Sequence, residues 1–200
     1  MIQRCRQPAS RADDARCKRV LAVIECILNQ NARDLGAASY MDMNWDVLDL
    51  CRTHQVGILQ MPCPEMVCLG FERTRSPGAS IRDVLDTEEG RRCCRSLSVH
   101  IADRLHEYHA QGFRVLAVLG GNPQSPGCAV HEGRHGLLPT SGVFMQELER
   151  ELKGRALAVP FRGIRDHDAK LLGDDMQWLK QKLSEGLGKP FVPGQSCCGP

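Results

Sequence analysis

Four short apolar runs, separated by segments with the periodicity of helices, restrict the fold of this chain more than any other feature. The runs cover residues 20–25, 56–61, 113–120 and 155–161. Each run is nearly continuously apolar, whereas a strand with one face in water alternates apolar and polar residues. Continuous runs are typical of parallel strands that are covered on both faces. We therefore predict four buried parallel strands.

The segments between these runs predict the helices that cover the sheet. Apolar residues recur with helical spacing over residues 41–54, 141–154 and 168–183. A longer helix is predicted to begin at a cap formed by Asp86, with Glu89 three residues later, and to end near Gly112.

Strands that alternate with helices favour βαβ units and a parallel sheet with helices on both faces. The predicted fold class is therefore α/β: a Rossmann-like three-layer sandwich with a mainly parallel sheet of four or five strands. Residues 64–85 follow neither pattern and are predicted to form a long loop. Long loops in compact domains are often functional.

The 200 residues are enough for one domain with its own core, which we place at residues 20–185. Residues 1–19 are rich in Lys and Arg and poor in apolar side chains, so a disordered basic arm is expected there. Residues 186–200 form a tail rich in Pro, Gly and Cys, which is expected to fray.

Composition argues against nucleic acid and membranes as partners. The formal net charge is only +2 and aromatic residues make up 4% of the chain, so neither the electrostatic field nor base stacking favours nucleic acid. No apolar run is long enough to span a bilayer, and no secretory signal precedes residue 20. We expect a cytoplasmic protein that acts on a small molecule, as a monomer or a homodimer.

The chain contains eleven cysteines, an unusually high number for a cytoplasmic protein. Cytoplasmic thiols are normally reduced, so metal binding or catalysis is expected before disulfides. Cys26, Cys63 and Cys128 fall at or just past the ends of the first three predicted strands. Because ligands of open parallel sheets bind at the carboxyl ends of the strands, we expect these three cysteines to meet there.

The loop before Cys128 has the composition of a rigid support. The sequence GGNPQSPGC, residues 120–128, combines three glycines with two prolines. Three thiolates at one place suit an iron–sulfur cluster or zinc. Either centre usually has four ligands, so three cysteines leave one metal position open, and an open position indicates chemistry.

Three motifs in this order resemble the 2-thiouracil desulfidase family. The matching residues are Cys26–Leu28 with Asn31 and Arg33, Cys63–Glu65, Ser125–Cys128, Glu132–Gly133 and Gly142–Val143. The resemblance covers roughly residues 20–155. The chain departs from the family pattern at Asn29, where the family has glycine, at Gly127, where it has serine, and at Ala129, where it has glycine.

The resemblance implies a [4Fe–4S] cluster held by Cys26, Cys63 and Cys128, with the fourth iron free to take the sulfur of a thiocarbonyl substrate. The implied reaction is hydrolytic: a thiolated pyrimidine becomes its oxo form and sulfide is released. A general base is needed near the attacking water, and Glu65, two residues after Cys63, is the candidate. Ser125 is the candidate hydrogen-bond partner of the substrate or the leaving sulfide.

Asn29, Asn31 and Arg33 follow Cys26 closely and are candidates for substrate binding, since amides can pair with the edge of a pyrimidine. Three other readings remain open. One is a non-catalytic iron–sulfur or zinc protein, for which Cys68 is the candidate fourth ligand. The second is another cluster-dependent lyase, and the third is an α/β protein with scattered structural cysteines.

Overall fold

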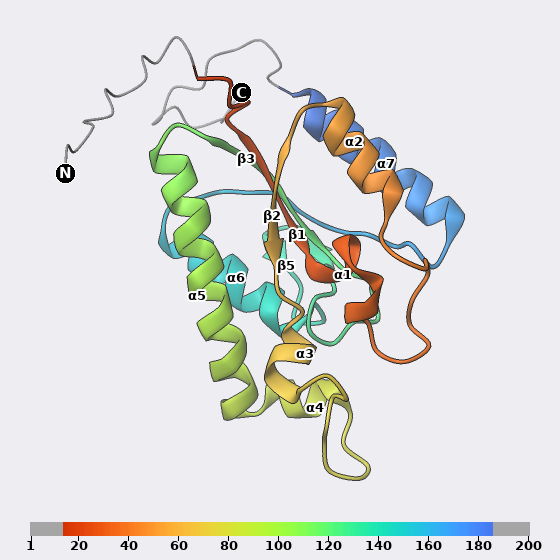
Figure 1. Ribbon diagram of the computed structural model, residues 1–200. Helices are drawn as coiled ribbons and strands as arrows, with labels where there is room; N and C mark the ends of the chain where they lie inside the picture. Colours follow the sequence, from red (N-terminus) through yellow and green to blue (C-terminus); the bar gives the residue numbers. More distant parts are fainter. Residues whose placement is uncertain (1–13, 186–200) are drawn as a thin grey trace, which may run out of the picture.

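A parallel sheet of four strands forms the centre of the fold, in the spatial order β2-β1-β3-β6 (Figure 1). The computed structural model describes residues 14–185, so most of the predicted basic arm and the whole predicted tail lie outside the described residues. The strands are β1 (Arg19–Ile24), β2 (Gly57–Met61), β3 (Arg114–Gly120) and β6 (Phe161–Gly163). All three strand pairings are parallel.

Helices cover both faces of this sheet, which confirms the predicted Rossmann-like three-layer α/β fold (Figure 1). On one face α2 (Trp45–Thr53) packs beside α7 (Ala169–Ser184), and on the other α5 (Glu88–Ala110) packs on α6 (Val143–Gly154). A two-stranded antiparallel hairpin of β4 (Glu132–Gly133) and β5 (Gly136–Leu137) precedes α6.

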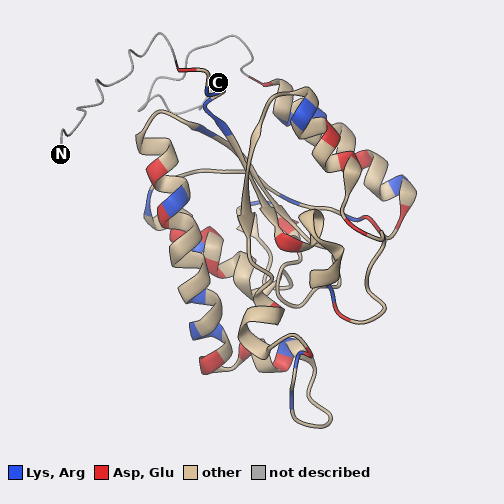
Figure 2. Ribbon diagram, viewed as in Figure 1, with Lys and Arg blue, Asp and Glu red and all other residues tan. Residues whose placement is uncertain are grey.

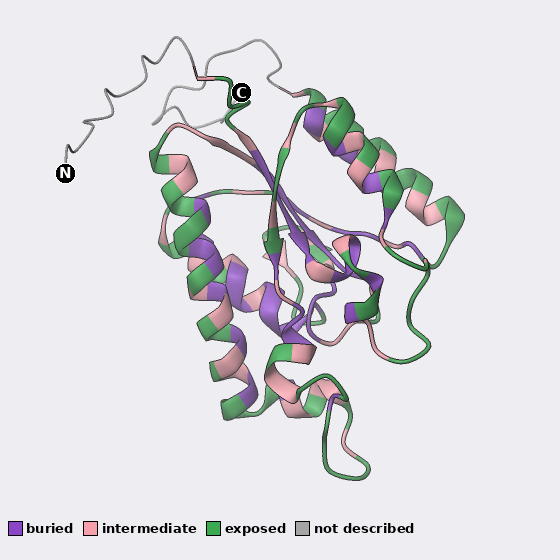
Figure 3. Cartoon of the chain, viewed as in Figure 1, coloured by how far each residue is buried: buried purple, intermediate pink, exposed green. Residues whose placement is uncertain are grey.

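Burial follows position in the sheet. β1 and β3, the two central strands, are buried over almost their whole length, as the continuous apolar runs predicted (Figure 3). β2 lies at the edge of the sheet, and four of its five residues are exposed or half-buried. The prediction of coverage on both faces therefore fails for β2, because an edge strand has a neighbour on one side only.

The predicted loop over residues 64–85 contains two short helices, α3 (Pro64–Leu69) and α4 (Ile81–Asp86). Pro64 occupies the first turn of α3, where its missing N–H costs no hydrogen bond. Ser80 and Asp83 form a reciprocal capping box at the start of α4. Asp86 ends α4 and does not cap α5; Thr87 does, by accepting a hydrogen bond from Gly90 N–H.

The fourth strand lies further along the chain than the sequence predicted. Residues 155–160 wrap around the end of α6, because Arg155 N–H bonds back to that helix and Ala156 takes a left-handed conformation at φ 54°. The chain reaches β3 only at Pro160, whose carbonyl accepts from Val118 N–H. β6 consequently starts at Phe161 and not at residue 155.

Charges of both signs alternate along the outer helices, as the coloured segments of α5 and α7 show (Figure 2). Among residues 14–185, no helix combines the length and apolarity that crossing a bilayer requires. A few charged side chains are buried inside the fold.

Cys51 in α2 and Cys94 in α5 are core residues, and their thiols link stability to pH. Burial raises the pKa of Cys51 to about 11, and burial with the nearby charge of Glu147 raises the pKa of Cys94 to about 12. An unfolded thiol has a pKa of about 8.5. The folded state therefore holds these protons more tightly. The stabilisation that each buried thiol contributes is fully present below about pH 8.5 and is lost as the pH rises toward 11 or 12.

We expect the free energy of unfolding to fall above pH 9 by up to about 1.4 kcal/mol per pH unit for each of the two thiols. The measurement is urea unfolding at pH 7, 9 and 10 for the wild type and for Cys51→Ala/Cys94→Ala. The double variant is expected to be less stable at pH 7 and to show a shallower alkaline slope. Cys17→Ala, which removes an exposed thiol, is the control, and equal slopes in all three proteins would contradict the prediction.

Candidate functional site

The register of the sheet brings the first two cysteines to the same edge. Ile24 is paired with Met61 at the end of β1 and β2, so Cys26 and Cys63 each lie two residues beyond this last pair. β3 runs on the other side of β1 and ends at Gly120. The chain passes from β1 to β2 on one side and then crosses from β2 to β3 on the other side of β1. Such a switch point, here between β1 and β3, is where open α/β sheets bind ligands.

Short helices fix the two cysteine backbones. Cys26 lies within α1 (Glu25–Leu28), directly after β1, and its carbonyl accepts from the Gln30 side chain at 2.7 Å. Cys63 is the N-terminal cap of α3, and its N–H donates to Glu25 Oε2 at 2.8 Å. This last hydrogen bond ties the end of β2 directly to the end of β1.

The loop that carries Cys128 is held by the start of α6. The N–H groups of Gly142, Val143 and Phe144 donate to the carbonyls of residues 129, 126 and 127, at 2.9–3.0 Å. A Cβ at Gly142 would lie only 2.3 Å from the backbone of residues 127 and 128. The predicted rigid support is therefore present, but the helix that follows contributes as much to it as the prolines do.

Glycines allow this loop to approach the other two strand ends. A Cβ at Gly121 would lie 2.7 Å from Cys128 Sγ and 3.9 Å from Cys26 Sγ, so both sulfurs lie close to one backbone position. A Cβ at Gly127 would meet Pro64 Cγ at 2.7 Å. Gly127, a departure from the family pattern, thus lets the loop pack directly on the Cys63–Pro64 segment.

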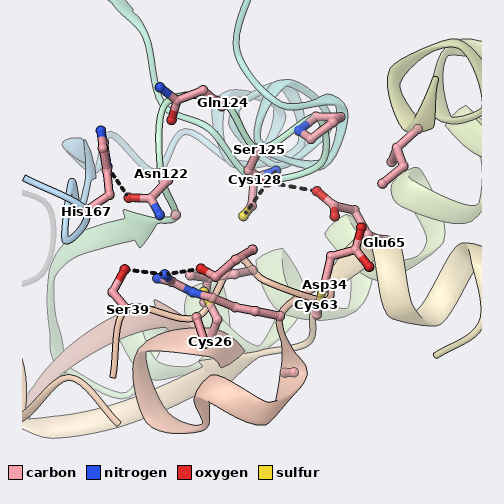
Figure 4. A pocket seen from close by; sticks show the side chains of 18 of the residues that line it. Cys26, Asp34, Ser39, Cys63, Glu65, Asn122, Gln124, Ser125, Cys128 and His167 are labelled. Carbon is pink, nitrogen blue, oxygen red and sulfur yellow. Dashed lines mark hydrogen bonds between the residues drawn. The ribbon is translucent and has the colours of Figure 1, made fainter. Parts of the chain in front are cut away.

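Cys26, Cys63 and Cys128 line one cavity of about 670 Å³ at the carboxyl ends of the strands (Figure 4). All three are nearly buried, with 7%, 8% and 5% of their surfaces exposed. Glu65, Ser125 and Arg33 line the same cavity. Six of the eight residues that the sequence nominated for the site are therefore brought together by the fold.

Ser125 connects Glu65 to Cys128. Its Oγ donates to Glu65 Oε1 at 2.8 Å, accepts from Cys128 N–H at 3.1 Å and lies 3.0 Å from Cys128 Sγ. Gly127 N–H also donates to Glu65 Oε1, at 3.1 Å. Both hydrogen bonds that fix this carboxylate use Oε1, so Oε2 is the oxygen available to a water or a substrate proton.

The thiols of the cavity are protonated at neutral pH when no metal is bound. Burial raises the pKa of Cys26 to about 11, although the neighbouring Arg33 opposes the shift. Burial also raises the pKa of Cys63, opposed by backbone N–H groups of α3, and raises that of Cys128 well above its ordinary value. A metal centre at these thiols would have to displace protons, which makes loading easier at higher pH.

Asn29 and Asn31 do not line the cavity. Asn29 Oδ1 accepts from the backbone and side-chain N–H groups of Asn31, at 3.1 and 2.9 Å, and caps the short 3₁₀ helix η2 (Gln30–Ala32). Both residues are exposed. Their place in the structure is that of turn residues, which short amide side chains favour because they can bond to nearby backbone groups.

Arg33 does line the cavity, but its guanidinium is already bound. It donates to Asp166 Oδ2 at 2.6 Å and to Ser39 Oγ at 3.1 Å, and Ser39 Oγ donates in turn to Asp166 Oδ1 (Figure 4). The side chains of Arg33 and Asp166 are 7% and 0% exposed. This buried ion pair forms one wall beside Cys26.

Several residues that line the cavity carry no signal in the amino-acid sequence. On the wall opposite Glu65, His167 Nδ1 lies within hydrogen-bond distance of Asn122 Oδ1, at 2.9 Å (Figure 4). Arg73, which lies in the segment predicted as a loop, is buried next to Cys63. Only three-dimensional proximity distinguishes these residues, since nothing in their local sequence marks them.

The three thiols supply the soft sulfur donors that an iron–sulfur cluster or zinc would use. Within residues 14–185, no three His, Cys, Asp or Glu side chains are arranged to hold one ion together. A cluster does not need such convergence, because each cysteine binds a different iron atom. Three soft sulfur donors around one cavity are also the donor set that iron–sulfur clusters use.

Cys68 forms a disulfide with Cys93, with the sulfurs 2.10 Å apart. This corrects the expectation that the thiols of the domain are all reduced. It also removes Cys68 as a fourth ligand for as long as the bond is formed. The bond joins α3, whose N-terminal cap is Cys63, to α5.

Comparisons with known proteins leave the function open. No protein-family model matches the chain, and no solved structure matches it. The chain is 28% identical over 136 residues to the uncharacterized protein MJ0003 of Methanocaldococcus jannaschii, an alignment that covers 68% of this chain and 79% of the relative.

Gly121→Ala is expected to lower metal affinity about 10-fold or more, because the new Cβ would displace Cys128 Sγ from its place beside Cys26. The measurement is iron bound per chain after anaerobic reconstitution and desalting. Gly173→Ala is the matched control: this glycine lies in α7 with open space around it, so alanine should stabilise the helix by about 0.5–1 kcal/mol and leave iron binding unchanged. Equal iron in both variants would contradict the prediction.

Proposed function

We propose that this protein is an iron–sulfur-dependent desulfidase that removes sulfur by hydrolysis from a small thiocarbonyl compound, such as a thiolated pyrimidine, and releases sulfide. The observation that carries the proposal is that Cys26, Cys63 and Cys128, from three separate strand ends, line one cavity together with Glu65 and Ser125. The same five residues carry the resemblance to the 2-thiouracil desulfidase family. We further propose that the protein acts in the cytoplasm and needs no nucleic-acid partner.

Cys26, Cys63 and Cys128 would hold a [4Fe–4S] cluster. When bound, such a cluster with three protein ligands supplies an open, sulfur-seeking Lewis-acid position that polarises a C=S bond. The cavity of about 670 Å³ is large enough for a single-ring substrate, and Ser39, Asn122 and Gln124 supply further polar groups to its lining.

Glu65 is the general base of the proposed reaction. Its carboxylate is 8% exposed, is fixed at Oε1 by Ser125 and Gly127, and leaves Oε2 to take a proton from the attacking water. The attack converts the thiocarbonyl carbon into a tetrahedral centre that carries one oxygen and one sulfur. When the C–S bond breaks, Glu65 returns its proton to the sulfur and takes the hydroxyl proton of this centre, so the carbon becomes C=O and hydrosulfide departs.

Ser125 positions this base and lies beside Cys128. Its single hydroxyl proton is donated to Glu65, while its oxygen lies 3.0 Å from Cys128 Sγ. Replacement by alanine would leave Glu65 free to rotate and would open space beside Cys128. Ser125 is therefore expected to affect the rate by orienting Glu65.

The alternative of a non-catalytic iron–sulfur or zinc protein is less well supported. Its named fourth ligand, Cys68, is bonded to Cys93. Another cluster-dependent lyase would use the same cysteines, and release of sulfide from a thiolated substrate separates that alternative from the proposed reaction.

The test is anaerobic reconstitution with iron and sulfide, desalting, and measurement of sulfide released from free thiopyrimidines. Glu65→Gln is expected to keep its iron and to lose about 10²–10⁴-fold in the rate of sulfide release. Cys128→Ala should lose both iron and activity. Glu107→Gln, which changes an exposed glutamate of α5, is the control for the loss of one carboxylate.

Two outcomes would contradict the proposal. One is a wild-type protein that binds no iron under these conditions. The other is an iron-loaded protein that releases no sulfide from any thiolated pyrimidine or related thiocarbonyl compound.

A further inference from the structure

Buried charges in this protein are paired, with two exceptions. The buried charged residues among residues 14–185 are Glu65, Arg73, Glu147, Asp166 and Asp175. The last three each form ion pairs with arginines: Glu147 with three, Asp166 with one and Asp175 with two. Within the same described residues, Arg73 and Glu65 form no ion pair within 4.0 Å, and both line the cavity of the three cysteines.

Arg73 is the more costly of the two exceptions. Its surface is 1% exposed, and a guanidinium cannot lose its charge to avoid the cost of burial. It donates to the carbonyls of Ala32 and Phe71, but neither of these carries a charge. Its Nε–H is buried without any hydrogen-bond partner in the described part of the chain.

The guanidinium also faces a cysteine thiol, which would become anionic on binding a metal. Arg73 Nη2 lies 3.8 Å from Cys63 Sγ, within hydrogen-bond distance for sulfur. Glu65, two residues after Cys63 in α3, is already bound by Ser125 and Gly127. The cation therefore faces the cavity at the sulfur of Cys63.

The backbone of Arg73 is held in a conformation that non-glycine residues rarely adopt. Its φ is 46°, in the left-handed region, where a side chain costs about 1 kcal/mol or more. Two hydrogen bonds maintain this turn: Arg73 N–H donates to the carbonyl of Gly70, and Arg75 Nη1 donates to the carbonyl of Arg73. Residues kept in such conformations tend to cluster at functional sites.

We propose that Arg73 is a positioning residue for the metal centre, which binds the sulfur of Cys63 and supplies the fixed positive charge that a centre of metal-bound thiolates requires. The inference rests on the proposed function only in taking the cavity to hold such a centre. The charge of three thiolates exceeds that of an oxidised [4Fe–4S] core, so the assembled centre would stay anionic, and a permanent cation beside one thiolate would stabilise it. A neutral side chain of similar length would leave that charge uncompensated.

The experiment compares Arg73→Gln, Arg73→Lys and the wild type after anaerobic reconstitution with iron and sulfide. Three quantities are measured: iron retained per chain after desalting, the rate of iron loss to a chelator, and the reduction potential of the bound centre. Arg92→Gln, which removes an exposed arginine of α5, is the control. The melting temperature of each metal-free protein is recorded as well.

Arg73→Gln is expected to lose iron about 10–100-fold faster than the wild type and to have a more negative reduction potential, since removal of a nearby positive charge disfavours the reduced centre. Arg73→Lys retains the charge and is expected to recover the wild-type potential and most of the iron retention. Arg92→Gln is expected to match the wild type in both quantities.

Wild-type iron retention and potential in a folded Arg73→Gln protein would overturn the inference. An Arg73→Lys protein that loses iron as fast as Arg73→Gln would also overturn it. So would failure of both variants to fold without metal. Either result would assign Arg73 a structural role. A wild-type protein that holds iron but releases no sulfide contradicts the proposed reaction alone, because iron retention in the variants still decides the role of Arg73. A wild-type protein that takes up no iron overturns both.

Discussion

The parallel register between β1 and its two neighbours is the constraint on which the site depends. Ile24 opposite Met61 fixes where Cys26 and Cys63 emerge from the sheet, and Val23 opposite Leu119 fixes where β3 releases the chain toward Cys128. A slip of one residue would turn every side chain of β1 to the opposite face of the sheet. Both faces of β1 are closely packed, so a slip would force side chains of different shape into each face, and this packing fixes where the cysteines emerge.

Backbone hydrogen bonds extend this precision beyond the strands. Glu25 connects the end of β1 to the N–H of Cys63, and the first N–H groups of α6 hold the carbonyls of residues 126–129. The N–H groups at the start of a helix have no hydrogen-bond partners within the helix. Here the carbonyls of the loop accept these hydrogen bonds, so both segments are held in place. Gly121, Gly127 and Gly142 permit these contacts because a side chain at any of them would collide with the neighbouring segment.

Charge is distributed unevenly between the core and the cavity. Elsewhere in the described residues a buried carboxylate is matched by one to three arginines, as around Glu147. Within the same described residues, Glu65 and Arg73 are buried at the cavity without an ion-pair partner. Groups kept in this costly state are common at sites that bind or transform a ligand. The same cavity also contains the three thiols whose pKa values burial raises.

The amino-acid sequence alone determined the fold class, the three-layer arrangement and the meeting of Cys26, Cys63 and Cys128, because continuous apolar runs imply a parallel sheet and the ends of its strands share one edge. It also nominated Glu65 and Ser125, which stand beside those cysteines in the chain. Tertiary structure alone decided that Asn29 and Asn31 bond each other away from the cavity, that Cys68 pairs with Cys93, and that Arg73, and not its neighbour Arg75, is buried against Cys63. The physical reason is that strand and helix patterns are local, whereas burial and pairing of a loop side chain depend on which distant segments pack over it.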